Sequence, residues 1–369
     1  MGKRELLIVV AFVALGALAF ELTAPPAPEG RGFSFSRWWQ TARRGIRGNQ
    51  AMASSTQQGE IDIGSGVSEL RIAGTNRGVR IIGEERKDVA WELHVESTGP
   101  DEATALAWAK KAKIKQDDLG SSLSLAVTFP TEGTQWGALI LKVPSRLTLK
   151  ISGGSGGADV SEVAGVDLDR VSGTVTLKDI VGAVTGSQSN GELTIAGAAA
   201  VDMTLSNTRA KIAEIKRGVV LTARNGRCEI GEVEGTVEIE QTNQETMIDK
   251  PAGMVRVTGS GGRVTIENPN KEVKVDCRRT EVEVSLDEAV PMTLLTTDET
   301  LRLVLDGPPA ISLDAVATDG GSIHGEDLDL AVKSSDNEQR CSKVFGSGNA
   351  QPRVTLRVVR GSIVIRKAK

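Results

Sequence analysis

A pattern of apolar and polar positions repeats every 17 or 18 residues between residues 149 and 284. Each repeat holds two short runs in which apolar and polar residues alternate, and alternation with a period of two is typical of strands with one buried face. One apolar column comprises Leu149, Val166, Val184, Val201, Val219, Val237, Val255 and Val273, and another comprises Val160, Leu177, Ile195, Ile212, Ile230, Ile248, Ile266 and Val284. The pattern predicts two strands in every repeat.

No single repeat can bury its apolar face alone, whereas stacked repeats line one continuous core. We therefore predict an all-β protein, a single-stack β-solenoid (β-helix) of about 17–18 residues per coil, with a small helical insertion near the N-terminal end. The alternative is a series of hairpins closed by type I′ turns, as in a barrel or propeller. Asn190-Gly191 suits such a turn, but Asn207-Thr208 and Asn243-Gln244 do not, because both central residues need positive φ.

Asn recurs at the bend between the two strands of four successive repeats, at Asn190, Asn207, Asn225 and Asn243. Asn tolerates the left-handed backbone conformation better than most residues, so it can turn the chain at a coil corner. Asn amides stacked above one another can also hydrogen-bond along the column. We therefore assign these four residues a structural role.

The N-terminal segment, residues 1–22, carries a targeting pattern. Lys3 and Arg4 precede an apolar run over residues 6–20. As a helix this run would span roughly 22 Å, which is less than the ~30 Å of a bilayer core. A cleaved signal peptide and a short signal anchor both fit the pattern. Either interpretation predicts a cell-envelope protein, exported and then membrane-anchored by the N-terminal segment or secreted after cleavage.

Four further parts follow this segment. The first, residues 23–58, is predicted to be a flexible basic and polar linker, and its Trp and Arg residues between Arg37 and Arg47 form either a solvated tether or a membrane-surface contact. The other three are an N-terminal β part with a helical insertion near Glu102 to Gln116 (residues 59–145), regular coils (residues 146–330), and a loop with terminal strands (residues 331–369).

Composition and charge limit the kind of core that the protein can have and the classes of partner that it can bind. Hydrophobic residues make up 39 % of the 369 residues, but aromatic residues only 3 %, so the core must consist of Val, Ile, Leu and Ala. The formal net charge of −4 gives no general attraction to nucleic acid, and we expect no nucleic-acid partner.

The residues that could carry chemistry are few and scattered. Cys228 falls in an apolar column and is expected to be a buried thiol, whereas a Cys277–Cys341 disulfide remains open. Thr246 is the polar member of that column, and we expect its hydroxyl to bond to a backbone carbonyl. His94 and His324 have no metal or nucleophile partner in sequence. We therefore predict no catalytic, cofactor-binding or metal-binding residues.

The order of motifs resembles a known family. The stretch "TNRGVRIIG", a helical insertion, "LKVPSRLTLKISGGSGG" and the recurring unit in "VVLTARNGRCEIGEVEG" are similar to the bacterial putative-adhesin family of β-strand-repeat proteins, over residues 59–305. The resemblance implies an envelope-associated repeat protein of poorly defined function, and it supplies no catalytic or ligand-binding residues.

Together these observations favour a non-enzymatic cell-envelope module for binding or adhesion. Its expected partners are an envelope protein or a glycan, and the membrane through the N-terminal segment. One alternative is a structural scaffold that self-associates through the exposed ends of the solenoid. Another is a carbohydrate-active β-helix enzyme, which the mixed signs of the outward columns favour less, because such enzymes gather carboxylates.

Overall fold

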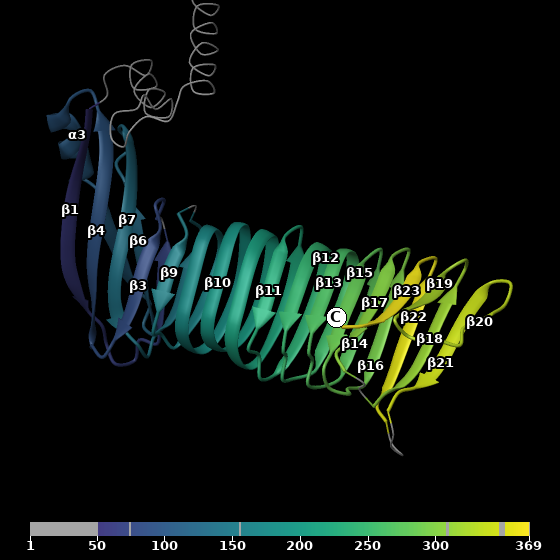
Figure 1. The fold of residues 1–369 in the computed structure, drawn as a ribbon. Coiled ribbons are helices and arrows are strands. Elements are labelled where there is room, and N and C mark those ends of the chain that lie inside the picture. The colour runs from purple at the N-terminus through teal and green to yellow at the C-terminus, as the bar shows by residue number, and fades with distance from the viewer. Residues whose placement is uncertain (1–50, 74, 155, 308–309, 347–350, 369) are drawn as a thin grey trace, which may run out of the picture. The chain divides into compact units, whose positions relative to one another are not determined.

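The computed structural model describes residues 51–368 apart from residues 74, 155, 308–309 and 347–350. Within these residues the chain is all-β with a single α-helix, which confirms the predicted class and the small helical insertion (Figure 1). The chain forms two compact units, and the larger unit comprises residues 56–95, 111–130 and 136–369. The predicted signal segment and most of the predicted linker lie outside the described residues.

The strands join one hydrogen-bonded sheet. The elements are β1 (Ala51–Asp62), β2 (Glu69–Ala73), β3 (Val79–Glu84), β4 (Asp88–Gly99), α3 (Glu102–Ala109), β5 (Lys113–Asp118), β6 (Ser122–Thr128), β7 (Thr134–Pro144), β8 (Thr148–Ser152), β9 (Ala158–Ser161), β10 (Gly165–Arg224), β11 (Arg227–Gly231), β12 (Thr236–Asp249), β13 (Val255–Glu267), β14 (Val273–Arg278), β15 (Glu281–Leu286), β16 (Met292–Thr297), β17 (Thr300–Leu305), β18 (Ser312–Thr318), β19 (Ser322–Glu326), β20 (Lys333–Ser334), β21 (Glu338–Val344), β22 (Arg353–Val359) and β23 (Ser362–Lys367).

Successive repeats pair in parallel, with an offset of 17 residues where β10 meets β8 and β9 and of 18 residues in the pairings from the end of β10 to β14. Val219 is opposite Val237, which in turn is opposite Val255 on β13, and Ile230 of β11 is opposite Ile212 and Ile248. All these side chains are buried. The apolar columns of the sequence are therefore cross-strand columns in one continuous core, as β-branched side chains on adjacent strands pack well.

The order of strands in space departs from their order in sequence near both ends of the larger unit. Near the N-terminal end, β2 lies between β6 and β8, and β3 lies between β7 and β9. Near the C-terminal end, β22 lies between β16 and β18, and β23 lies between β17 and β19, as the yellow ribbons in Figure 1 show. The strand pairs β2–β3 and β22–β23, near the two ends of the chain, are therefore internal layers of the stack of strands.

Three segments differ from the sequence-based prediction. The helix ends at Ala109 rather than near Gln116, and residues 113–118 form β5, which pairs antiparallel with β6. Residues 51–58, predicted as linker, belong to β1, which pairs with β4. The predicted loop in residues 331–369 contains β20 and β21, and β21 pairs antiparallel with β18. In each case pairing with another strand overrides weak local strand propensity.

Candidate functional site

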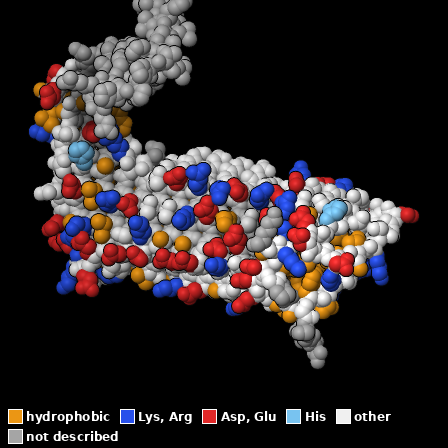
Figure 2. Space-filling view, in the orientation of Figure 1, with side chains coloured by type: hydrophobic (Ala, Val, Ile, Leu, Met, Phe, Trp, Pro, Cys, Tyr) orange, Lys and Arg blue, Asp and Glu red, His pale blue; other side chains and the backbone are white. Residues whose placement is uncertain are grey.

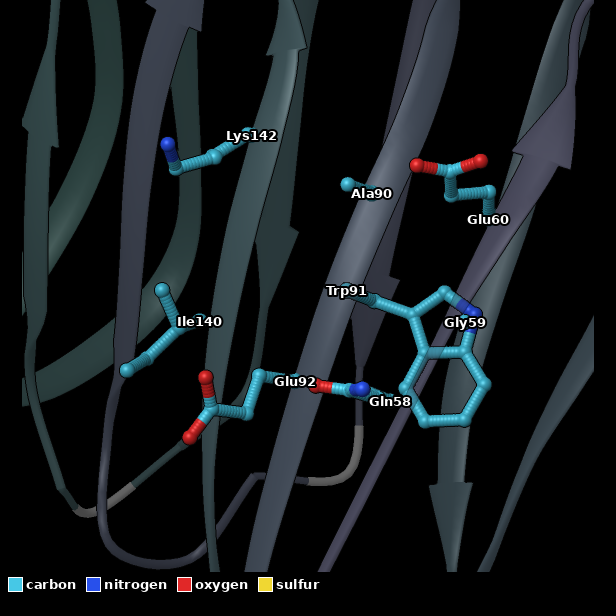
Figure 3. Close-up of a pocket in the computed structure, with 8 residues that line it drawn as sticks. All are labelled: Gln58, Gly59, Glu60, Ala90, Trp91, Glu92, Ile140 and Lys142. Atoms are coloured by element: carbon cyan, nitrogen blue, oxygen red, sulfur yellow. The ribbon is translucent and has the colours of Figure 1, made fainter.

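A surface depression lies over β1, β4 and β7 (Figure 3). Its volume is about 520 Å³, within the range of small-molecule sites. The lining residues are Gln58, Gly59, Glu60, Ala90, Trp91, Glu92, Ile140 and Lys142. All of them belong to the larger unit, so the depression rests on a three-stranded support.

The depression forms because successive side chains of a strand point to opposite faces of the sheet, and a small outward side chain leaves a gap. On β4, Ala90 and Glu92 point away from the core, because Val89 and Leu93 are buried on the opposite face. Ala90 carries only a methyl group, and the outward side chains of the neighbouring strands are longer. Ile140 of β7, with 37 % of its surface exposed, adds an apolar contact at the surface.

Trp91 of β4 packs against Gly59 of β1. A Cβ built at Gly59 would lie 2.7 Å from Cζ2 of the Trp91 indole, so any larger residue there would require the ring to shift. Figure 3 shows the indole lying across β1 at Gly59. The pair packs β1 against the middle strand β4, and covering a strand glycine with an aromatic ring restores packing that the glycine lacks.

The polar groups of the depression are mostly acceptors. The carboxylates of Glu60 and Glu92 and the amide of Gln58 border the hollow. Lys142 is its basic residue, and the Lys142 Nζ lies 3.0 Å from Oε1 of Glu84, which neutralises part of its charge. Carboxylate and amide oxygens accept hydrogen bonds from hydroxyl and amide groups. The site therefore suits a ligand rich in hydroxyl or amide donors.

The four Asn residues assigned from the sequence lie at one corner of the larger unit. All four have positive φ, between 49° and 56°. Asn207 Nδ2 donates to Asn190 Oδ1 at 3.0 Å, and Asn243 Nδ2 donates to Asn225 Oδ1 at 3.4 Å. Asn207 and Asn225 also border a shallow groove of about 400 Å³ with Glu192, Arg209 and Arg227. None of the four lies at the depression over β4.

Buried polar side chains form bonds with one another near the same corner. Thr246 Oγ1 donates to Gln241 Oε1 at 2.8 Å, so its partner is a side chain rather than the expected backbone carbonyl. Gln244 Nε2 donates to Cys228 Sγ at 3.2 Å. These contacts satisfy groups that would otherwise destabilise the core, and they leave no free nucleophile there.

The cysteines are all free and buried. Cys277 on β14 and Cys341 on β21 are separated by β16, β22 and β18, which places them roughly 19 Å apart at the usual strand spacing and excludes a disulfide between them. Burial raises the pKa of Cys228 to about 12 and that of Cys277 to about 12. Burial also raises the pKa of Cys341.

We expect these thiols to be unreactive in the folded protein. At pH 8 a thiol with a pKa near 12 is about one part in 10⁴ thiolate, and thiolate is the reactive form. With a chromogenic disulfide reagent, the native protein should release almost no thiolate product within an hour, and three equivalents after addition of guanidinium. The variant Cys228→Ser should release two. A rapid stoichiometric burst without denaturant would contradict the buried placement.

The histidines do not form a site. His94 on β4 contacts Thr56 with 3.1 Å between Nδ1 and Oγ1, and His324 on β19 contacts Ser322 with 2.8 Å between Nε2 and Oγ. In the part of the chain that the structure describes, no group of three or more His, Cys, Asp or Glu side chains could hold a metal ion. Sequence reasoning missed the depression because its strands come from three separate segments, one of which carries a linker-like composition.

Comparison with known proteins gives only remote matches. No family model matches the chain, and no curated protein matches it. A solved structure of a putative cell adhesion protein from Clostridium sporogenes covers 86 % of this chain and 100 % of its own, with 11 % identity and a TM-score of 0.20. A putative adhesin from Bacteroides fragilis covers 86 % and 97 %, with 10 % identity and a TM-score of 0.26.

A third structure, a putative lipid binding protein from Parabacteroides distasonis, covers 86 % of this chain and 97 % of its own, with 11 % identity and a TM-score of 0.29. The adhesin descriptions agree with the family resemblance found in the sequence. Likenesses at these TM-scores carry no argument about what this chain binds.

Proposed function

We propose that this protein is a non-enzymatic binding module of the bacterial cell envelope, that its repeats form a β-solenoid, and that it binds a glycan at the depression over β4. The parallel 18-residue register supports the solenoid, because each repeat then forms one coil above the last. The depression is the observation that carries the binding role: it combines acceptor oxygens with the apolar side chain of Ile140 on a rigid sheet.

The outer surface supports binding more than catalysis. Acidic and basic side chains are interspersed on the visible face of the coils (Figure 2), and neighbouring strands pair them, as in Arg227 with Glu245 and Arg209 with Glu192. A carbohydrate-active enzyme would need two carboxyl groups gathered about one bond. Glu60 and Glu92 both border the depression, so the non-enzymatic proposal rests on the paired charges of the coils.

Self-assembly through the ends has less support. The antiparallel strand β5 carries Lys113, Lys115, Asp117 and Asp118, and charged side chains of this kind hinder pairing with a further strand. Export remains a proposal based on residues 1–22. Within the described residues, no helix has the length and apolarity needed to span a membrane.

The glycan proposal is tested by filling the hollow. On an array of bacterial and host surface glycans, the full chain should bind a reproducible set, and Ala90→Phe should reduce that binding at least tenfold because its ring occupies the space above β4. Thr222→Phe is the matched control, since Thr222 lies on an outward strand position of β10, away from the depression. Failure to bind any glycan reproducibly, or equal binding by Ala90→Phe, would refute the proposal.

A further inference from the structure

One carboxylate near the C-terminal end of the larger unit is shared by three arginines. Arg353 Nη2 and Arg357 Nη2 lie 3.0 and 3.5 Å from Asp314 Oδ2, and Arg340 Nε lies 3.5 Å from Oδ1. Outward charges on the coils more often pair one to one, as in Lys150 with Asp167. Three cations around one anion leave a positive excess.

Strand pairing brings these residues together from distant parts of the chain. Asp314 is on β18, which lies between β22, carrying Arg353 and Arg357, and β21, carrying Arg340. Arg357 and Arg340 are both opposite Val316, one on each side. The guanidinium groups therefore converge on Asp314 from both neighbouring strands.

The carboxylate is buried while the arginines remain accessible. The side chain of Asp314 is 13 % exposed, against 70 % for Arg353, 52 % for Arg340 and 41 % for Arg357. Burial alone would raise the pKa of Asp314, but the hydrogen bond from Arg353 and the charges of Arg340 and Arg357 outweigh it and lower the pKa. Asp314 is therefore a fixed anion that orients the three guanidinium groups.

Most of the arginine donors stay available to a ligand. Each guanidinium has five N–H donors, whereas a carboxylate accepts about four hydrogen bonds in all. Arg353 Nη2 and Arg357 Nη2 are at most about 6.5 Å apart, since both lie near the same Asp314 oxygen. A single tetrahedral anion can therefore reach both, because charge-assisted N–H···O⁻ bonds are about 2.7–2.9 Å long.

The surroundings favour phosphate over a simple carboxylate. The hydroxyl residues Thr355 and Ser342 are opposite Asp314 on its two sides, and they add donors at the same place. Lys333 of β20 is opposite Arg340 and adds a further positive charge. Glu338, on the same strand as Arg340, partly offsets this charge. Forked arginines beside hydroxyl groups match the several acceptor oxygens of a phosphate group.

We propose that Arg340, Arg353 and Arg357, oriented by Asp314, form a binding site for phosphate groups. This site is separate from the depression over β4 and does not depend on the glycan proposal. A phosphate of this kind belongs either to the headgroup of an anionic lipid or to a soluble phosphate ester, and both present the same monoester or diester oxygens to the arginines.

Two binding assays test the proposal with the full chain. Calorimetric titration at low salt with inorganic phosphate and glycerol 3-phosphate measures the soluble form. Sedimentation with vesicles of phosphatidylglycerol, compared with phosphatidylcholine, measures the headgroup. Binding in either assay supports the site and identifies its source where the arginine variants below reduce it, because the N-terminal segment of the full chain can itself attach to vesicles. No binding in both assays, or binding that those variants leave unchanged, overturns the proposal.

Matched variants separate a specific site from general charge. Arg353→Gln combined with Arg357→Gln should weaken phosphate binding at least tenfold, and Arg256→Gln, which removes an exposed arginine on β13 paired with Glu238, should change it less than twofold. Arg353→Lys keeps the charge and the fold but loses the forked donors, and should weaken binding threefold to tenfold. Equal losses for Arg256→Gln, or none for Arg353→Lys, would overturn the proposal.

Discussion

Removal of residues 353–369 is expected to detach the C-terminal layers of the larger unit rather than shorten its end. These residues form β22 and β23, which lie between β16–β17 on one side and β18–β19 on the other. The deletion therefore takes an internal layer out of the stack, and it leaves the apolar faces of both neighbours without a partner.

The size of the effect follows from what these strands bury. Their inward side chains are at most 1 % exposed, and they are Val354, Leu356, Val358, Ile363 and Ile365. At about 1.5–3 kcal/mol for each buried side chain, the lost burial is on the order of 10 kcal/mol. That is comparable with the whole stability of an ordinary domain, about 5–15 kcal/mol. Strands β18 and β19 should then no longer remain docked.

Limited proteolysis and circular dichroism measure this outcome. The deleted protein should become sensitive to protease between residues 306 and 346, while the coils of β10 to β14 persist because repeats contact only their neighbours. A variant with residues 353–369 replaced by a Gly–Ser segment of equal length should behave in the same way, since it restores chain length without strands. Wild-type melting and an unchanged cleavage pattern in either protein would show that the intercalated layer contributes little.

The regular coils could be predicted because their pairing is local in sequence. A residue such as Val237 meets the residues 18 positions before and after it, so the apolar columns appear directly as a period. The left-handed corner at Asn225 could be anticipated for the same reason, because one residue type recurs at one position of the period. Periodicity reports contacts of constant separation, and most of the larger unit consists of them.

The intercalated layers could not be predicted because their contacts have no constant separation. Leu356 meets Leu294 and Ala315, at two unrelated distances along the chain. The same holds for Arg353 and Arg357, which reach Asp314 only once β22 has entered between its neighbours. The depression depends likewise on β1, whose polar residues carry little strand propensity and form a strand through pairing with β4.

An aspartate in place of Ile230 should destabilise the protein far more than loss of the neighbouring Arg227. Ile230 on β11 is 2 % exposed and packs between Ile212 and Ile248 of the adjacent strands. Ile230→Asp removes an apolar side chain, which alone costs about 2–5 kcal/mol on truncation, and adds a carboxylate with no partner in the core. Arg227→Ala removes a half-exposed side chain that pairs with Glu229 and Glu245, a change of about 0–1 kcal/mol.

The pH dependence of the Ile230→Asp variant distinguishes a buried charge from lost packing. Burial raises the pKa of an introduced aspartate above its unfolded value of about 3.9. The folded state then binds more protons than the unfolded state, so the variant loses stability relative to wild type as pH rises above 4. Urea melts of both proteins at pH 4 and pH 7 should show the larger difference at pH 7. Equal small shifts for Ile230→Asp and Arg227→Ala would contradict the inward placement of Ile230, and a deficit independent of pH would mean that the new carboxylate reaches solvent.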